Sequence, residues 1–128
     1  MNNRKILLLD SNVSMYLLNA DISALELLDG ETTALSFVSE IELLGWPSIT
    51  AKEKKIIEAF IEASYYYDYS TAIKDIAIQL RIQYRLKLGD SLIAATALNY
   101  DLTLISADKA FLKVKGLQLI NFIPTISK

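Results

Sequence analysis

The stretch between Leu86 and Phe111, LKLGDSLIAATALNYDLTLISADKAF, constrains the fold more than any other part of the sequence. Asp90 opens an apolar, helix-forming segment, and a turn at Asp101 leads into the short apolar run LTLIS. Asp108 follows that run almost directly. A short apolar run bounded by turn residues is typical of a strand buried on both faces. The stretch therefore predicts a helix that begins at an acid and a buried strand that leads to another.

Comparable units recur along the rest of the chain. We expect strands at residues 5–10, 33–38, 65–67 (a strand or a turn), 103–106 and 118–121, and helices at 13–19, 21–28, 39–44, 51–63, 71–86, 90–99 and 108–112. Strands that alternate with helices imply a parallel sheet covered on both sides. No repeat or linker interrupts the pattern. The predicted fold is α/β, with residues 1–128 as a single domain: a three-layer α/β/α sandwich around a central, mainly parallel sheet.

Two residue types are missing from the 128 residues, and both absences limit the chemistry. Without cysteine there are no disulfides, thiolate metal sites or thiol nucleophiles. Without histidine the chain lacks the commonest general base and the commonest transition-metal ligand. The net charge of −2 provides no overall attraction to nucleic acid. An enzyme of this composition has to rely on carboxylates, hydroxyls, Lys, Arg or Tyr, or on a metal held by oxygen.

The sequence also carries expectations about location. No apolar run is long enough to span a bilayer. Residues 1–5 lead straight into the first predicted strand, which leaves no room for a signal peptide. We therefore expect a cytoplasmic protein that does not associate with membranes.

Four acids have similar positions relative to the predicted strands. Asp10 ends the first strand, Asp108 follows the fourth, and Asp90 stands at a helix start. Glu42 lies one helical turn after Ser39, so its side chain can point back to the same edge of the sheet. In parallel α/β sheets, ligands bind in the crevice at the carboxyl ends of the strands. We therefore expect the four acids to converge there.

Each acid also has a simpler interpretation when it is taken alone. Asp10 and Asp108 could cap the helices that follow them. Asp90 would be favoured at a helix start by the helix dipole. Glu42 could be a solvated helix residue, and Glu40 competes with it for the same role. Only the four acids together favour a shared site.

Four sequence blocks occur in a fixed order: Leu9-Asp10-Ser11-Asn12, SFVSEIELL from Ser36, GDSLIAATA from Gly89, and LISADKAF from Leu104. Together they resemble the PIN-domain ribonucleases, most closely the VapC-like toxins of bacterial toxin–antitoxin systems. The resemblance covers residues 6–121 and includes every acid of the family pattern. This chain has Ser11 and Ser106 where the pattern has Thr, and Gly89 where it has Pro.

The resemblance implies a nuclease in which Asp10, Glu42, Asp90 and Asp108 are the catalytic metal ligands, and it implies RNA as the substrate. Two carboxylates about 4 Å apart repel each other by roughly 4 kcal/mol at an effective dielectric near 20. A divalent cation would offset that repulsion, and hard carboxylate oxygens suit Mg²⁺ or Mn²⁺. Such a metal lowers the pKa of a bound water, which supplies a nucleophile without a histidine base.

Further roles extend this assignment. Asn12 and Ser106 are expected to orient Asp10 through hydrogen bonds. The candidates for holding the RNA backbone by charge are Arg81, Arg85, Lys87 and Lys109. A solvated helix face explains the basic residues before Asp90 equally well.

The VapC resemblance also implies partners: a cognate antitoxin, whose arginine-bearing tail would pair with the acids, and a second copy of the chain in a homodimer. Two alternatives stay open, a PIN nuclease of RNA processing or decay without an antitoxin, and a catalytically idle PIN-like module that binds RNA or protein. A haloacid-dehalogenase-type phosphatase would need a second Asp where this chain has Asn12. A receiver domain's acid and lysine pattern does not fit cleanly, and no glycine-rich nucleotide loop is present.

Overall fold

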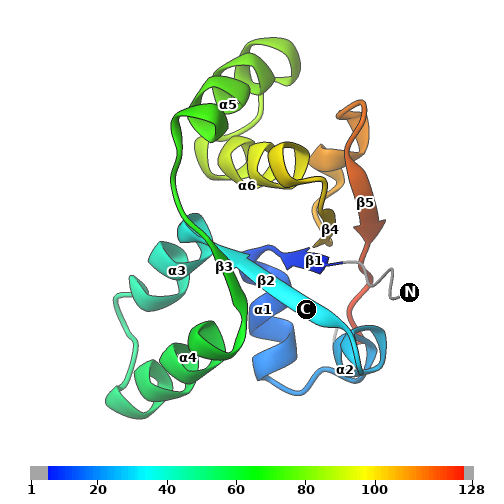
Figure 1. Ribbon diagram of the computed structural model, residues 1–128. Helices are drawn as coiled ribbons and strands as arrows, with labels where there is room; N and C mark the ends of the chain where they lie inside the picture. Colours follow the sequence, from blue (N-terminus) through cyan, green and yellow to red (C-terminus); the bar gives the residue numbers. More distant parts are fainter. Residues whose placement is uncertain (1–5, 126–128) are drawn as a thin grey trace, which may run out of the picture.

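The computed structural model describes residues 6–125, and its centre is a five-stranded parallel sheet (Figure 1). The strands are β1 (Ile6–Leu9), β2 (Thr32–Ser36), β3 (Tyr65–Tyr67), β4 (Thr103–Ser106) and β5 (Gln118–Asn121). They lie in the order β3-β2-β1-β4-β5, and each neighbouring pair is parallel. The predicted parallel sheet is confirmed. The expectation that concerned residues 1–5 lies outside the described residues.

Helices cover both faces of this sheet. They are α1 (Ser11–Leu18), α2 (Ile22–Leu28), α3 (Phe37–Leu44), α4 (Ala51–Ala63), α5 (Thr71–Tyr84) and α6 (Leu88–Tyr100), and a 3₁₀ turn, η1, spans Lys109–Lys113. Figure 1 shows α5 and α6 on one side of the sheet and α1, α2 and α4 on the other. The predicted three-layer α/β/α fold is therefore confirmed.

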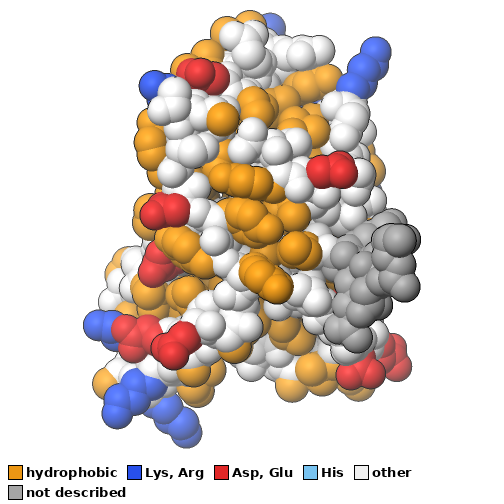
Figure 2. All heavy atoms as spheres, in the orientation of Figure 1, with side chains coloured by type: hydrophobic (Ala, Val, Ile, Leu, Met, Phe, Trp, Pro, Cys, Tyr) orange, Lys and Arg blue, Asp and Glu red, His pale blue; other side chains and the backbone are white. Residues whose placement is uncertain are grey.

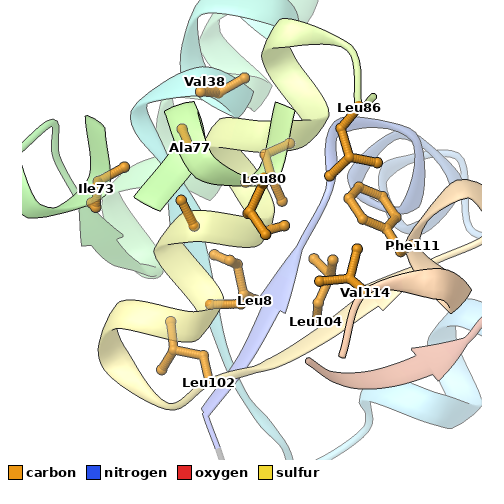
Figure 3. Packing of buried hydrophobic residues seen from close by; sticks show 14 of the residues in the cluster. Leu8, Val38, Ile73, Ala77, Leu80, Leu86, Leu102, Leu104, Phe111 and Val114 are labelled. Atoms are coloured by element: carbon orange, nitrogen blue, oxygen red, sulfur yellow. The ribbon is translucent and has the colours of Figure 1, made fainter. Parts of the chain in front are cut away.

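The central strand explains why its sequence is uninterruptedly apolar. Successive side chains of a strand point to opposite faces. Leu8 packs into the cluster under α5 and α6, whereas Leu7 and Leu9 pack into the cluster on the α1 and α2 side. Figure 3 shows the first cluster, with Leu8 and Leu104 on the sheet side and Leu80 on the helix side. A polar residue in β1 would have no solvated face to occupy.

Helix α6 is held on the sheet by the small residues that the sequence places along it. Ala94, Ala95 and Ala97 are buried, and α6 packs against α5 along much of its length. Small side chains let two helices approach closely. This packing fixes the first turn of α6, and with it Asp90, at the carboxyl end of the sheet.

The start of α3 differs from the prediction. The strand was expected to run through Val38 with Ser39 as the helix cap, but β2 ends at Ser36 and α3 begins at Phe37. The Ser36 hydroxyl accepts a hydrogen bond from the Ser39 backbone N–H at 3.4 Å, so Ser36 is the cap. Two serines of the same capping chemistry compete here, and the earlier one lets Val38 reach the core.

Several other helix ends are shifted by one or two residues; α1, for example, begins at Ser11 rather than Val13, with Asp10 as its N-cap. Helix α5 ends at Tyr84 rather than near Leu86, because Arg85 adopts a left-handed conformation (φ 58°) that stops the helix. Helix α6 begins at Leu88, so Asp90 lies in its first turn rather than at its first residue. The shift at the start of α6 concerns Asp90, one of the four acids singled out by the sequence.

The side of the molecule in Figure 2 carries hydrophobic side chains, tyrosines included, across its middle around β3. Tyr65 and Tyr66 of β3 are exposed, and the Tyr66 hydroxyl donates to the Glu40 carboxylate at 2.5 Å. This is the edge of the sheet opposite β5. Within residues 6–125, no helix combines the length and the apolarity needed to cross a membrane.

Candidate active site

The topology brings two acids to neighbouring strand ends. Asp10 directly follows β1, and Asp108 lies two residues after β4. β1 and β4 are paired, with Leu9 beside Ile105. Adjacent parallel strands end at the same edge of a sheet, so the two acids meet there for a purely geometric reason.

The other two acids come from helices above that edge. Glu42 belongs to α3 and Asp90 to the first turn of α6. All four acids line one cavity of about 650 Å³. The structure thus brings together the four carboxylates that the sequence singled out, while their catalytic and metal-binding roles remain predictions.

Asp10 is both a helix cap and a member of this cavity. Its Oδ1 accepts the Val13 backbone N–H at 2.8 Å, and its Oδ2 accepts the hydroxyl of Ser106. The Ser106 Oγ in turn accepts the Asp108 backbone N–H at 3.0 Å. Ser106 is fully buried and Asp10 is 6% exposed. One hydroxyl therefore links the two strand-end acids and fixes the orientation of Asp10, in agreement with the hydrogen bond predicted for Ser106.

The acids of the cavity affect one another's pKa values. Burial raises the pKa of Asp10, and the charges of Asp90 and Asp108 raise it further, against the hydrogen bonds from Ser106 and Val13. Burial also raises the pKa of Asp90, as do Asp108 and Glu42, while Lys87 lowers it. A cavity that disfavours ionised carboxylates in this way is suited to a cation.

A contact that the sequence did not predict lies beside Glu42. The Ser11 hydroxyl donates to Glu42 Oε1. The other oxygen, Oε2, lies next to Gly89, where an added Cβ would be 3.5 Å away from it. Glu42 is therefore held between the start of α1 and the start of α6. Ser11 stands where the pattern of the first block has Thr, and both side chains carry a hydroxyl. This similarity is the sequence signal that could have indicated the contact.

The remaining predicted residues are placed less centrally. Asn12 lines the cavity with an exposed side chain, and within residues 6–125 it makes none of the hydrogen bonds to the Asp10 carboxylate. Arg85, Lys87 and Lys109 are exposed and do not line the cavity where the structure describes it. Lys87 acts on Asp90 through its charge. Arg81 donates instead to the Leu86 carbonyl at 3.2 Å.

The donor set fits a hard divalent cation in type. Carboxylate oxygens are the ligands that Mg²⁺ and Mn²⁺ prefer, and four carboxylates face one cavity. Among residues 6–125, however, no three acids stand close enough to form a metal-binding group as they are. Asp108 has an exposed side chain, which can change rotamer. The fold thus places the four acids around one cavity, and a bound cation would draw their side chains closer together.

The cavity continues from the acids along an apolar wall that sequence reasoning did not find. Helices α1, α3 and α4 contribute Met15, Ile41 and Ile56, and Trp46 follows α3. Trp46 is 64% exposed. Glu53 of α4 adds a fifth acid, and no Lys or Arg lines the cavity in the described part of the chain. The wall is built from helices far apart in sequence, so no local pattern marks it.

The sequence matches a known protein-family model. The family model described as PIN domain matches residues 7–117. No curated protein matches the sequence.

Similar solved structures include a toxin–antitoxin complex from Klebsiella pneumoniae, at 24% identity over 89% of this chain and 95% of that chain, with a TM-score of 0.77. VapBC2 from Rickettsia felis, bound to a fragment of promoter DNA, has 24% identity over 92% of this chain and 99% of that chain, with a TM-score of 0.79. VapBC-1 from nontypeable Haemophilus influenzae has 22% identity over 91% and 97%, with a TM-score of 0.77. At such identities the likeness shows a shared fold.

Proposed function

Because the chain belongs to the PIN-domain family, whose members are nucleases, we propose that it is a Mg²⁺- or Mn²⁺-dependent endoribonuclease that hydrolyses RNA phosphodiester bonds. The observation that carries this proposal is the cavity itself. Four carboxylates from β-strand ends and helices line it together, in a chain that has neither histidine nor cysteine. Such a set of groups supports hydrolysis through an oxygen-held metal better than it supports nucleophilic or histidine-based catalysis.

In this mechanism Asp10, Glu42, Asp90 and Asp108 would hold the metal directly or through water. When bound, the metal would lower the pKa of a water molecule and offset negative charge on the phosphate. Ser106 and the Val13 backbone N–H keep Asp10 in place. The raised pKa values of Asp10 and Asp90 mean that acid pH would keep protons on two of the ligands and weaken metal binding.

A cleavage assay tests the proposal. Purified protein should cut single-stranded RNA in the presence of Mn²⁺ or Mg²⁺ and not in EDTA. Asp10→Asn should abolish cutting while circular dichroism shows an intact fold. Asp75→Asn, a change of the same kind on the exposed face of α5, is the matched control and should cut normally. Equal cutting with and without EDTA would exclude the metal mechanism.

We further propose that the protein acts as the toxin of a toxin–antitoxin pair. Support comes from the fold it shares with the chains of toxin–antitoxin complexes, and from the character of the cavity. Its apolar wall and its five carboxylates, unaccompanied by a lining Lys or Arg in the described part of the chain, are complementary to an amphipathic segment that carries arginine. An antitoxin segment of that chemistry would cover the acids. The expected homodimer and the cytoplasmic location belong to this proposal.

Expression in cells tests the toxin role separately from the chemistry. Wild-type protein produced without a partner should arrest growth, and Asp90→Asn should relieve the arrest at equal protein levels. Unimpaired growth in cells that contain active, soluble wild-type protein would remove the toxin proposal and leave the nuclease proposal standing.

One observation favours a second candidate, a PIN-like module that binds RNA or protein without cutting. Among residues 6–125 no three acids stand close enough to hold a metal as they are, which is what an idle site would show. The two candidates differ in one measurement. Retention of RNA in a binding assay without any cleavage across a Mn²⁺ titration would favour the binding module.

A further inference from the structure

Ser11 forms a hydrogen bond with Glu42, and the proposed hydrolysis gives this serine no role. Ser11 is the first residue of α1, directly after the cap Asp10. Its hydroxyl donates to Glu42 Oε1 across 31 positions of sequence, from α1 to α3. A hydrogen bond from a hydroxyl to an ionised carboxylate is stronger than one between neutral groups. The bond therefore links the start of α1, which Asp10 caps, to α3, which carries Glu42.

The Ser11 hydroxyl has two acceptors within reach, Ser39 and Glu42. Ser11 Oγ lies 3.4 Å from the Oγ of Ser39, which is fully buried. The Ser39 hydroxyl reaches the carbonyl of Leu9, at the end of β1, also at 3.4 Å. A hydroxyl has one proton, and the carboxylate of Glu42 is the strongest acceptor that the Ser11 hydroxyl contacts. Ser11 thus donates to Glu42, and the neighbouring Ser39 hydroxyl donates to the Leu9 carbonyl.

The second oxygen of Glu42 lies beside the start of α6. Glu42 Oε2 lies beside Gly89, the residue that precedes Asp90. With Oε1 bound by Ser11, the carboxylate cannot turn freely out to solvent, although Glu42 is exposed. Its orientation in the cavity therefore depends on the Ser11 hydroxyl.

We propose that Ser11 is a positioning residue that directs Glu42 toward the metal-binding cavity. It does not contact substrate or metal in this role, and it acts through Glu42. The inference rests on the proposed metal-dependent function. Loss of a group that orients a metal ligand typically weakens metal binding by about 10- to 100-fold. Removal of the Ser11 hydroxyl should have an effect of that size on the binding of Mn²⁺.

The experiment measures Mn²⁺ affinity rather than activity alone. The chain has a single tryptophan, Trp46, and it lines the same cavity, so its fluorescence reports on Mn²⁺ binding. Ser11→Thr and Ser11→Val have nearly the same shape and differ by the hydroxyl. The Thr variant should bind Mn²⁺ like the wild type, and the Val variant about tenfold or more weakly. Ser64→Ala, which removes a hydroxyl bonded to the Phe60 carbonyl away from the cavity, is the control and should bind normally.

A double-mutant cycle separates positioning from a general structural effect. If Ser11 acts through Glu42, then Ser11→Val should cost no further Mn²⁺ affinity when Glu42→Ala is already present. An equal loss in both backgrounds would overturn the proposal, and so would equal Mn²⁺ affinity of the Thr and Val variants. Should the Val variant fail to fold by circular dichroism, Ser11→Ala takes its place in the same cycle.

The same samples distinguish this inference from the proposed function. Wild-type protein that binds Mn²⁺ but cuts no RNA would end the nuclease proposal, while the affinity cycle would still decide the role of Ser11. RNA cutting that depends on Mn²⁺, combined with Ser11 variants of unchanged affinity, would end the positioning role alone.

Discussion

Replacement of Ser106 by alanine should destabilise the metal-free protein, and more so at neutral than at acid pH. The buried Ser106 hydroxyl donates to Asp10 Oδ2 and accepts the Asp108 backbone N–H. A hydrogen bond to a charged group contributes about 1.5–3 kcal/mol and a neutral one about 0.5–1.5 kcal/mol. Asp108 is exposed, so water can replace the partner of its N–H. We therefore expect a loss near the lower end of the sum, about 2 kcal/mol, from a free energy of unfolding of about 5–15 kcal/mol.

The pH dependence follows from the pKa of Asp10. Burial raises this pKa in the folded protein, so ionisation of Asp10 works against folding as the pH rises through the raised value. The hydrogen bond from Ser106 lowers the pKa and so limits that loss. Without the hydroxyl the loss above the raised pKa grows. Below the ordinary pKa of 3.8, Asp10 is protonated in the folded and unfolded states alike, and the alanine variant should lose less there.

Urea unfolding in EDTA at pH 7 and at pH 3 measures both effects. Ser91→Ala is the matched control, because Ser91 is also fully buried but donates to a neutral acceptor, the Leu88 carbonyl at 2.7 Å. Its loss of stability should be the same at both pH values. If Ser106→Ala showed a loss that did not change with pH, the Asp10 carboxylate would not depend on this hydroxyl, and the reasoning about its orientation would be refuted.

Three further outcomes are expected. Asp90→Asn should stabilise the metal-free protein at pH 7 and not at pH 3, because burial and neighbouring acids raise the pKa of Asp90 and its ionisation opposes folding; urea unfolding in EDTA measures this. Mn²⁺ at about 100 times its Kd should raise the free energy of unfolding of the wild type by about 2.7 kcal/mol, and EDTA should remove the gain. Thr50→Ala, which breaks the capping box with Glu53, should cost about 1 kcal/mol in thermal unfolding at any ionic strength.

The sequence was informative wherever local chemistry and burial coincide. The apolar run of β1 predicted a strand buried on both faces because each of its side chains has a core to enter. Residues 51–63 were predicted as a helix, and α4 has these bounds because its apolar positions repeat with helical spacing and Thr50 caps its start. The positions of Asp10 and Asp108 just after two strands predicted that they meet, because paired parallel strands end at the same edge of the sheet.

Prediction was weaker where several residues of one chemistry compete or where contacts cross the chain. Ser36 and Ser39 can both cap a helix, and only the packing of Val38 decides between them. Ser11 lies 31 positions from Glu42, so their hydrogen bond is invisible to any local pattern. The position of Asn12 two residues after Asp10 suggested a hydrogen bond to the Asp10 carboxylate, but the helix geometry gives that bond to the Val13 N–H instead. The apolar cavity wall arises only after α1, α3 and α4 are packed.

The two interpretations of Asp10, helix cap and metal ligand, are not alternatives once its oxygens are counted. A carboxylate has about four lone-pair positions. The Val13 N–H occupies one on Oδ1, and the Ser106 hydroxyl occupies one on Oδ2, which leaves acceptor capacity on both oxygens. The same two bonds hold the carboxylate rigidly in a place where burial raises its pKa. Capping therefore prepares Asp10 for a cation rather than competing with it, since the donors favour the charged form that a cation requires.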